Sequence, residues 1–268
     1  VLLLCNPAKP GPMRLETIGA SHYVEKVRWC LDRLGIDYVE DQNLGVFGAM
    51  FGGRTVPRLH VRTGAVESSI GNSSDILRFL WGREGDSERA QFLAPTEEAV
   101  ALEKQLDRYG ALMQQWIYFH ILDEPELCSR AWGANDPRVP AWQRAMAGLI
   151  TPLLRVFIRR AFRIESGRNE KTLARVDQIL SPLEEAMGDG RRYLLGGDEL
   201  SYVDLTLAAL SGLWLMPLNY GAGMADDVRF PSSDAPEAMQ RDMQLWRDAY
   251  PKLVAHMEAL YANERLSA

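Results

Sequence analysis

Three short segments of the chain hold residues that could stabilise a thiolate or another anion. The first is Ser21-His22-Tyr23, which follows a short apolar run and directly precedes a helix-forming segment. Backbone N–H groups without partners and the positive end of the helix dipole gather at such a place. A thiolate or an anionic ligand is stabilised there. Serine before a helix is equally a common N-cap, so a capping role and a chemical role for Ser21 both stay open.

The other two segments carry weaker signals. Val56-Pro57 opens an expected strand, where Pro is ordinary, and an X-Pro bond is cis in only about 5% of folded cases. Asn72-Ser73 stands before another expected helix, where polar side chains and free N–H groups could bind a carboxylate. Capping alone also explains Asn72 and Ser73.

Ser201 and Asp204 have the spacing of a capping box, in which the side chain of each residue accepts the backbone N–H of the other. Leu200 and Leu205 flank them as a hydrophobic staple would. We interpret this segment as a folding element rather than a catalytic one.

The composition excludes several classes of protein. The chain has 268 residues with 30 Lys and Arg against 36 Asp and Glu, a net charge of −6, whereas a nucleic-acid binder would carry a basic excess. No apolar run approaches the ~20 residues of a membrane-spanning helix, so we expect no membrane partner. The three cysteines lie far apart, which disfavours a disulfide framework or a metal site and indicates a reducing, cytoplasmic location.

Short elements of alternating type are predicted before residue 82. Val24, Val27, Leu31 and Leu34 recur at helical spacing, and Gly35 follows where a left-handed residue ends a helix. A strand, helix and strand of this length form a parallel pair joined by a right-handed crossover. The predicted strands are 13–18, 36–39, 56–61 and 65–70.

From about residue 95 the apolar pattern is helical throughout. Apolar residues step by three or four along 102–119, 142–162 and 173–187, and further helices are expected from Ser201 and over 236–261 with an interruption at Pro251. The sequence therefore predicts a small α/β domain followed by an all-α helical bundle. The predicted parts are an N-terminal extension (1–12), the α/β domain (13–81), a linker (82–93) and the helical domain (94–268).

These motifs, in this order, resemble those of the cytosolic glutathione transferase superfamily. The segment 21–38 is similar to its first helix and second strand, Val56-Pro57 to its cis-proline segment, and Asn72-Ser73-x-x-Ile76 to its Glu/Gln-Ser-x-x-Ile segment. The segment 196–204 is similar to the capping motif of its helical domain. The resemblance covers residues 13–262 and implies a thioredoxin-like first domain that holds glutathione.

The resemblance also implies roles for individual residues. Ser21 would donate a hydrogen bond to the glutathione sulfur and would be the catalytic residue. The residues implied to bind the rest of glutathione are Val56 through its backbone, Pro57 in the cis form, Asn72 and Ser73 at the γ-glutamyl carboxylate, and Arg54 at the glycyl carboxylate. Glutathione would be a co-substrate, and no metal is implied.

This chemistry is energetically sufficient. A free thiol has a pKa near 8.5, and lowering it by about two units requires roughly 2.7 kcal/mol in favour of the thiolate. A hydrogen bond to a charged acceptor contributes about 1.5–3 kcal/mol, and a helix N-terminus adds about 0.3–1 kcal/mol. Ser21 need not lose its own proton.

Departures from the family pattern leave alternatives open. His22 stands where Pro or Ser is frequent, and either His22 or Tyr23 could assist the thiol, although we favour a solvent-facing His22. Asn72 replaces an acidic or Gln residue, which keeps open a non-catalytic binding or assembly module. Position 21 is not Cys, which disfavours a disulfide reductase. A glutathione-dependent isomerase or dehalogenase remains possible, without the Ser-Ser-Cys run that would favour the isomerase.

The helical domain would supply a pocket for a small hydrophobic electrophile. We expect a homodimer in which residues 93–110 line the contact between subunits, as is usual in the family. The expected pocket residues are Met113, Trp116, Tyr118 and His120 on one helix, and Trp214, Asn219 and Tyr220 near a later one.

Overall fold

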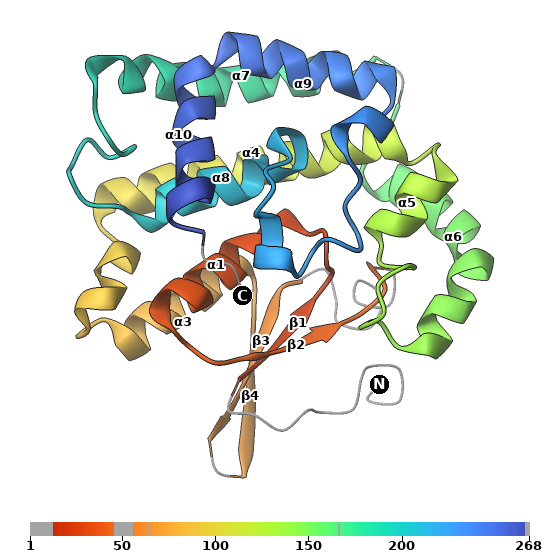
Figure 1. The fold of residues 1–268 in the computed structure, drawn as a ribbon, viewed down its shortest axis with the longest axis horizontal. Helices are drawn as coiled ribbons and strands as arrows, with labels where there is room; N and C mark the ends of the chain where they lie inside the picture. The colour runs from red at the N-terminus through yellow and green to blue at the C-terminus, as the bar shows by residue number, and fades with distance from the viewer. Residues whose placement is uncertain (1–12, 46–55, 64, 166, 266–268) are drawn as a thin grey trace.

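The computed structural model describes residues 13–45, 56–63, 65–165 and 167–265. A small sheet lies at one side of the molecule, and helices make up most of the remainder (Figure 1). The strands are β1 (Met13–Thr17), β2 (Val39–Gln42), β3 (Arg58–Thr63) and β4 (Val66–Gly71). They are ordered β2-β1-β3-β4, with β1 parallel to β2 and the other pairs antiparallel. The predicted α/β fold of this part of the chain is confirmed, whereas the predicted extension and Arg54 lie outside the described residues.

Helix α1 (His22–Leu34) connects the parallel strands β1 and β2. Its inward face carries the predicted apolar residues, among them Val24, Val27 and Leu31, which are fully buried. Gly35 ends the helix in the left-handed region at φ 67°, where a residue without Cβ is favoured, and its N–H donates to the carbonyl of Asp32.

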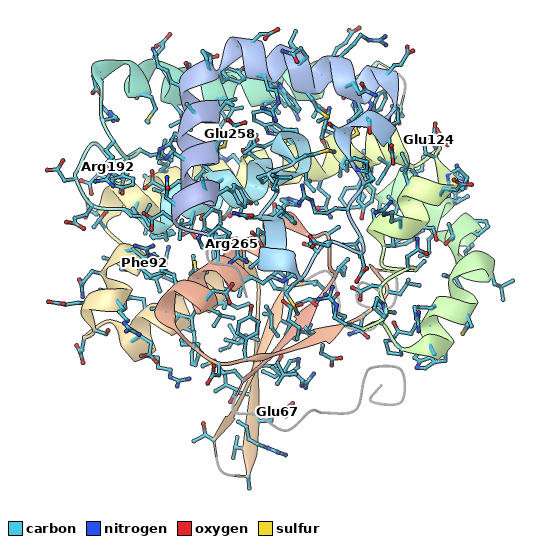
Figure 2. The ribbon with its side chains drawn as sticks, in the orientation of Figure 1. Glu67, Phe92, Glu124, Arg192, Glu258 and Arg265 are labelled. Carbon is cyan, nitrogen blue, oxygen red and sulfur yellow. The ribbon has the colours of Figure 1, made fainter. Side chains whose placement is uncertain are left out.

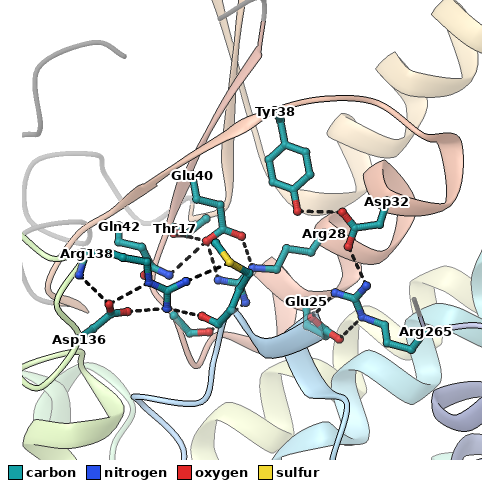
Figure 3. Close-up of polar contacts among 12 residues, drawn as sticks. Thr17, Glu25, Arg28, Asp32, Tyr38, Glu40, Gln42, Asp136, Arg138 and Arg265 are labelled. Carbon is teal, nitrogen blue, oxygen red and sulfur yellow. Dashed lines mark hydrogen bonds and ion pairs between the residues drawn. The ribbon is translucent and has the colours of Figure 1, made fainter. Parts of the chain in front are cut away.

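Strand β2 begins three residues later than predicted, at Val39 instead of Ile36. Its residues Glu40, Asp41 and Gln42 are polar and yet buried, so an apolar pattern could not reveal them. The fully buried Arg28 of α1 compensates Glu40, to which Nη2 donates at 2.9 Å (Figure 3). A buried ion pair therefore replaces apolar contacts in this edge strand of the sheet.

Helix α3 (Ser73–Glu84) extends into the predicted linker, and the 3-10 helix η1 (Glu88–Leu93) occupies most of its remainder. The helical part that follows contains α4 (Glu97–Ile121), α5 (Pro125–Ala131), α6 (Ala141–Ala161), α7 (Arg168–Ala186), α8 (Tyr202–Leu215), α9 (Glu237–Ala249) and α10 (Pro251–Asn263), with short 3-10 turns η2 (Met187–Asp189), η3 (Tyr220–Gly223) and η4 (Ser232–Asp234). Pro251 opens α10, as the predicted interruption requires. The short helix α5 has no counterpart in the sequence prediction.

The predicted capping box at the start of α8 is present. The fully buried Asp204 accepts the backbone N–H of Ser201 at 3.1 Å through Oδ2. Its other oxygen accepts from the backbone N–H of Leu194 at 2.9 Å and contacts Nε2 of His256 at 3.0 Å. Asp204 thus joins three parts of the helical domain, which supports its structural role.

One continuous apolar core joins the sheet to the helices, because buried residues of β1, α1 and α8 belong to the same cluster. The end of the chain reinforces this junction, since Arg265 lies beside α1 in the interior (Figure 2). Its Nε donates to Glu25 at 2.9 Å and its Nη1 to Asp32 at 2.7 Å (Figure 3). Both contacts fix α1, the helix whose N-terminus carries Ser21.

Candidate active site

A cavity of about 650 Å³ lies between the sheet domain and the helices α4, α6 and α8. Its wall includes the loop that precedes α1, the start of α1, and Val56 before β3. The opposite wall comes from the helical domain and is mainly apolar. Such a concave site with a few polar groups is typical of binding sites for small molecules.

The strand register brings three of the sequence motifs to one edge of the sheet. Arg58, the first residue of β3, pairs with Gly71, the last residue of β4. Pro57 precedes Arg58 and Asn72 follows Gly71, so both lie at the same edge of the sheet. Arg58 also pairs with Glu16 of β1, which places the loop after β1 at that edge. Segments far apart in the sequence therefore meet where α1 begins.

Ser21 is the N-cap residue of α1, but its side chain makes no capping hydrogen bond. Ser21 lines the cavity and is partly buried. The N–H groups of the first turn of α1 have no intrahelical acceptor, and they face the same end of the helix. The Ser21 hydroxyl is thus placed to donate to an anion in the cavity, with the positive end of the helix dipole beside it.

Three hydrogen bonds hold the loop that carries Ser21. The Ser21 N–H donates to the carbonyl of Ile18 at 2.9 Å, and Nη1 of Arg28 donates to the carbonyl of Gly19 at 3.1 Å. The hydroxyl of Tyr220, from the helical domain, donates to the carbonyl of Ala20 at 3.1 Å. Both domains therefore position Ser21.

His22 is buried, contrary to the solvent-facing position favoured from the sequence. Its Nε2 lies 3.0 Å from the carbonyl oxygen of Gly110 in α4, and because a carbonyl only accepts, Nε2 carries the proton. Burial lowers the pKa of His22 to about 4, against an opposing effect of this hydrogen bond. His22 lines the cavity as a neutral imidazole and is a weak base for a thiol.

The buried His22 predicts a specific pH dependence of stability. At pH above 6.5 it is neutral in both the folded and the unfolded chain, so its full contribution is present. As the pH falls from 6.5 towards 4, the unfolded chain binds a proton that the folded protein excludes, which costs up to about 3 kcal/mol. Urea unfolding at several pH values is expected to show this loss in the wild type and not in His22→Gln. The same pH dependence of the free energy of unfolding in both proteins would contradict the prediction.

Tyr23 is partly buried, and its hydroxyl donates to the backbone carbonyl of Asp107 at 3.3 Å. Burial, and then the nearby Asp107 carboxylate, raise the pKa of Tyr23 well above its usual range. Tyr23 stays protonated at neutral pH, and its proton is already engaged. Its placement in the cavity wall is compatible with an accepting role only.

The peptide bond between Val56 and Pro57 is cis, as the family resemblance implies. Asn72 is the N-cap of α3 at φ 71°, and its side-chain oxygen accepts the N–H of Ser74 at 3.1 Å. Capping thus accounts for the Asn72 oxygen. Ser73, the first residue of α3, is 2% exposed. Asn72 and Ser73 lie at the shared sheet edge but outside the wall of the cavity.

A buried polar cluster between the domains holds α1, α3 and α4 together, and sequence reasoning did not anticipate it. Lys26 of α1 donates to Glu103 at 2.9 Å and to the hydroxyl of Ser74 at 3.1 Å. Arg78 of α3 also pairs with Glu103. This cluster fixes the start of α3, and with it Ser73, relative to α1.

Of the expected pocket residues, Tyr118 and Tyr220 line the cavity and the others do not. Met113 and Trp214 are fully buried in the core, while Trp116 and His120 both contact Asp242 at 2.9 and 2.8 Å. Asn219 donates to the carbonyl of Tyr261 at 3.1 Å. The apolar stripe of α4 that suggested a pocket packs into the protein instead.

Besides Tyr118, the residues of α4 that line the cavity are neighbours of the expected ones, namely Gln114, Ile117 and Ile121. Successive residues of a helix are about 100° apart, so a shift of one position turns a side chain from the core to the cavity. Helix α6 contributes Leu154, Phe157 and Ile158, and the segment before α9 contributes Arg229. No local pattern in the sequence marks these residues, because the packing of separate helices decides which face looks inward.

The thiols of the described residues are not at the site. Cys30 and Cys128 are both free and buried, and burial raises the pKa of each to about 12. Across the described ranges, no three His, Cys, Asp or Glu side chains are grouped so as to hold a metal ion. Within those ranges, too, no helix is both long and apolar enough to cross a membrane.

Comparisons with known proteins agree with this architecture. Residues 166–259 match the family model of the glutathione S-transferase C-terminal domain. No curated protein matches the chain.

Solved structures match almost the whole chain. A glutathione S-transferase from Methylobacterium radiotolerans, in complex with glutathione sulfonate, is 19% identical, with 96% of this chain and 95% of that chain covered and a TM-score of 0.52. One from Methylobacillus flagellatus with glutathione bound is 16% identical, with coverages of 94% and 98% and a TM-score of 0.53. At these identities the likeness establishes the fold. The chain has the two-domain fold of these glutathione S-transferases, and residues 166–259 match the model of their C-terminal domain.

Proposed function

We propose that the protein binds glutathione and activates its thiol for addition to a small hydrophobic electrophile. The carrying observation is the placement of Ser21, which lines the cavity at the N-terminus of α1 without capping that helix. The glutathione compounds bound in two proteins of the same fold support the identity of the thiol.

The proposed binding follows the sheet edge. The glutathione sulfur accepts a hydrogen bond from Ser21, and the backbone of Val56 beside the cis-Pro57 pairs with the cysteinyl unit. Ser73 and Asn72 hold the γ-glutamyl end, and Arg54 serves the glycyl carboxylate. The electrophile occupies the apolar part of the cavity, where Ile117, Tyr118 and Phe157 are among the wall residues. The thiolate then attacks the electrophilic carbon directly.

Conjugation of a chlorodinitrobenzene with glutathione tests this proposal. Ser21→Ala is expected to lower kcat/KM by about 10- to 100-fold, because a hydrogen bond to a charged acceptor contributes about 1.5–3 kcal/mol. Ser21→Thr keeps a hydroxyl and is the matched control, expected to stay within about threefold of wild type. Full activity of a folded Ser21→Ala would remove Ser21 from the mechanism.

The alternative functions can be distinguished with the same protein by its retention on immobilised glutathione and by its activity. A non-catalytic binding or assembly module would be retained on immobilised glutathione but conjugate nothing. A glutathione-dependent isomerase or dehalogenase would depend on Ser21 while preferring another substrate. Absence of retention on glutathione would overturn the proposed function as a whole.

We further propose a cytoplasmic homodimer whose contact includes residues 93–110. The exposed face of α4 there is polar and carries Lys104 and Arg108, whereas α6 exposes Leu149 and Leu153 at 80% and 73%. Sedimentation equilibrium is expected to give twice the chain mass for wild type and for Leu149→Glu, and the monomer mass for Arg108→Glu. The reverse pattern would move the contact to α6.

A further inference from the structure

The cavity carries a single formal charge at neutral pH among the described residues that line it. Arg229 supplies this charge, and the wall around it is otherwise apolar or neutral, with the hydroxyl-bearing residues Ser21, Tyr23, Tyr118 and Tyr220 among its members. His22 also lines the cavity, but burial lowers its pKa to about 4 and leaves it neutral. Among the described residues that line the cavity, Arg229 is therefore the one charged group that a bound molecule can meet.

Arg229 lies over a residue that contacts the catalytic loop. Its guanidinium carbon is 5.1 Å from the centre of the Tyr220 ring, a cation–π distance. The hydroxyl of that ring donates to the carbonyl of Ala20, the neighbour of Ser21. The Tyr220 side chain thus connects the two groups, because its ring contacts the guanidinium of Arg229 and its hydroxyl contacts the loop that carries Ser21.

No Asp or Glu side chain of the described residues forms an ion pair with Arg229. Its guanidinium makes no hydrogen bond or ion pair with the described residues, and every Asp and Glu of the chain belongs to them, since 1–12, 46–55, 64, 166 and 266–268 contain none. The carboxylate of Glu25, which faces Tyr220, binds Arg265 at 2.9 Å, and Glu40 binds Arg28 at 2.9 Å (Figure 3). The guanidinium therefore keeps its hydrogen-bond donors for a ligand.

We propose that Arg229 binds a carboxylate of the electrophilic co-substrate. This inference rests on the proposed function, and it narrows the co-substrate to an apolar molecule that carries a carboxylate a few atoms from its reactive carbon. The planar guanidinium pairs with a carboxylate through two parallel hydrogen bonds, which orients the molecule as well as attracting it. The rest of the molecule lies against the apolar wall that includes Ile117 and Phe157.

Glutathione itself is a second source of carboxylates, and matched substrates separate the two sources. The pair is 4-chloro-3-nitrobenzoate and its neutral methyl ester. In both, the glutathione thiolate forms the C–S bond, chloride leaves with the electron pair of the broken C–Cl bond, and the thiol proton passes to solvent.

Arg229→Gln is expected to lower kcat/KM for the benzoate by about 10- to 100-fold and to leave that for the ester within about threefold. Arg229→Lys is expected to retain part of the benzoate activity, and the KM for glutathione is expected to stay unchanged. Arg175→Gln, an exposed position on α7, is the control for the same change in net charge. An equal loss with both substrates, or a raised KM for glutathione, would overturn the assignment to the co-substrate.

A binding measurement tests Arg229 without relying on turnover. Calorimetric titration with the unreactive 4-methyl-3-nitrobenzoate is expected to give a Kd about tenfold or more higher for Arg229→Gln than for wild type. Equal Kd values would overturn the carboxylate site. An enzyme inactive with both substrates that still shows this difference would reject the proposed conjugation but keep the carboxylate site.

Discussion

Replacement of Arg28 by Met is expected to lower the free energy of unfolding by about 3–5 kcal/mol. Arg28 is 0% exposed, and its guanidinium donates twice to Glu40 and once to the carbonyl of Gly19. The substitution takes this cation away from the buried Glu40 carboxylate. It also frees Gly19, so the loop before Ser21 loses one of the hydrogen bonds that hold it, and conjugation is expected to fall together with stability.

Two further variants separate the effect of the positive charge of Arg28 from the effect of its hydrogen-bonding geometry. Arg28→Lys keeps a cation but not the fork that binds two oxygens, and we expect an intermediate loss. In Arg28→Met with Glu40→Gln no buried charge is left in the pair, and the double variant is expected to be more stable than Arg28→Met alone. Urea unfolding measures all three, and an unchanged midpoint for Arg28→Met would contradict the buried ion pair.

Gly212→Ala is expected to disrupt the cavity, although alanine is the better helix former. A Cβ at Gly212 in α8 would lie 2.3 Å from Cε2 of Tyr220, a ring that is 1% exposed. Relieving such a contact typically costs about 1–3 kcal/mol, more than the ~1 kcal/mol gained in helix propensity. Displacing Tyr220 also breaks its hydrogen bond to Ala20, so conjugation is expected to fall at least tenfold.

Gly82→Ala is the matched control, since a Cβ at Gly82 in α3 would have no neighbour within 4 Å. It is expected to raise the melting temperature slightly and leave kcat/KM unchanged. Tyr220→Val is expected to recover part of the stability lost in Gly212→Ala, because it removes the ring atoms involved. A Gly212→Ala protein as stable and active as wild type would show that Tyr220 moves freely.

Local patterns predicted the elements that carry Ser21 but not the surroundings of that residue. The spacing of Val24, Val27 and Leu31 was sufficient for α1, and Ser201 with Asp204 was sufficient for the start of α8. These features depend on residues within one or two helical turns. The resemblance to a family added the cis bond before Pro57, which no local rule favours.

What the sequence did not predict depends on distant partners. From the sequence alone Glu40 and His22 look like surface residues. Both are buried because the fold brings Arg28 to Glu40, and the carbonyl of Gly110 in α4 to His22. Trp116 and His120 looked suitable for a pocket, but Asp242, more than a hundred residues later, binds both in the helical domain. Arg229 belongs to no sequence motif, and its proposed role follows only from its position in the cavity wall.

The pKa of the glutathione thiol in the complex tests the central claim most directly. Thiolate absorbance in the ultraviolet, followed against pH, measures this pKa in wild type and in Ser21→Ala. We predict a value about two units below the ~8.5 of a free thiol in wild type, and a rise by about one to two units in Ser21→Ala. Equal pKa values in the two proteins would contradict activation of the thiol by Ser21.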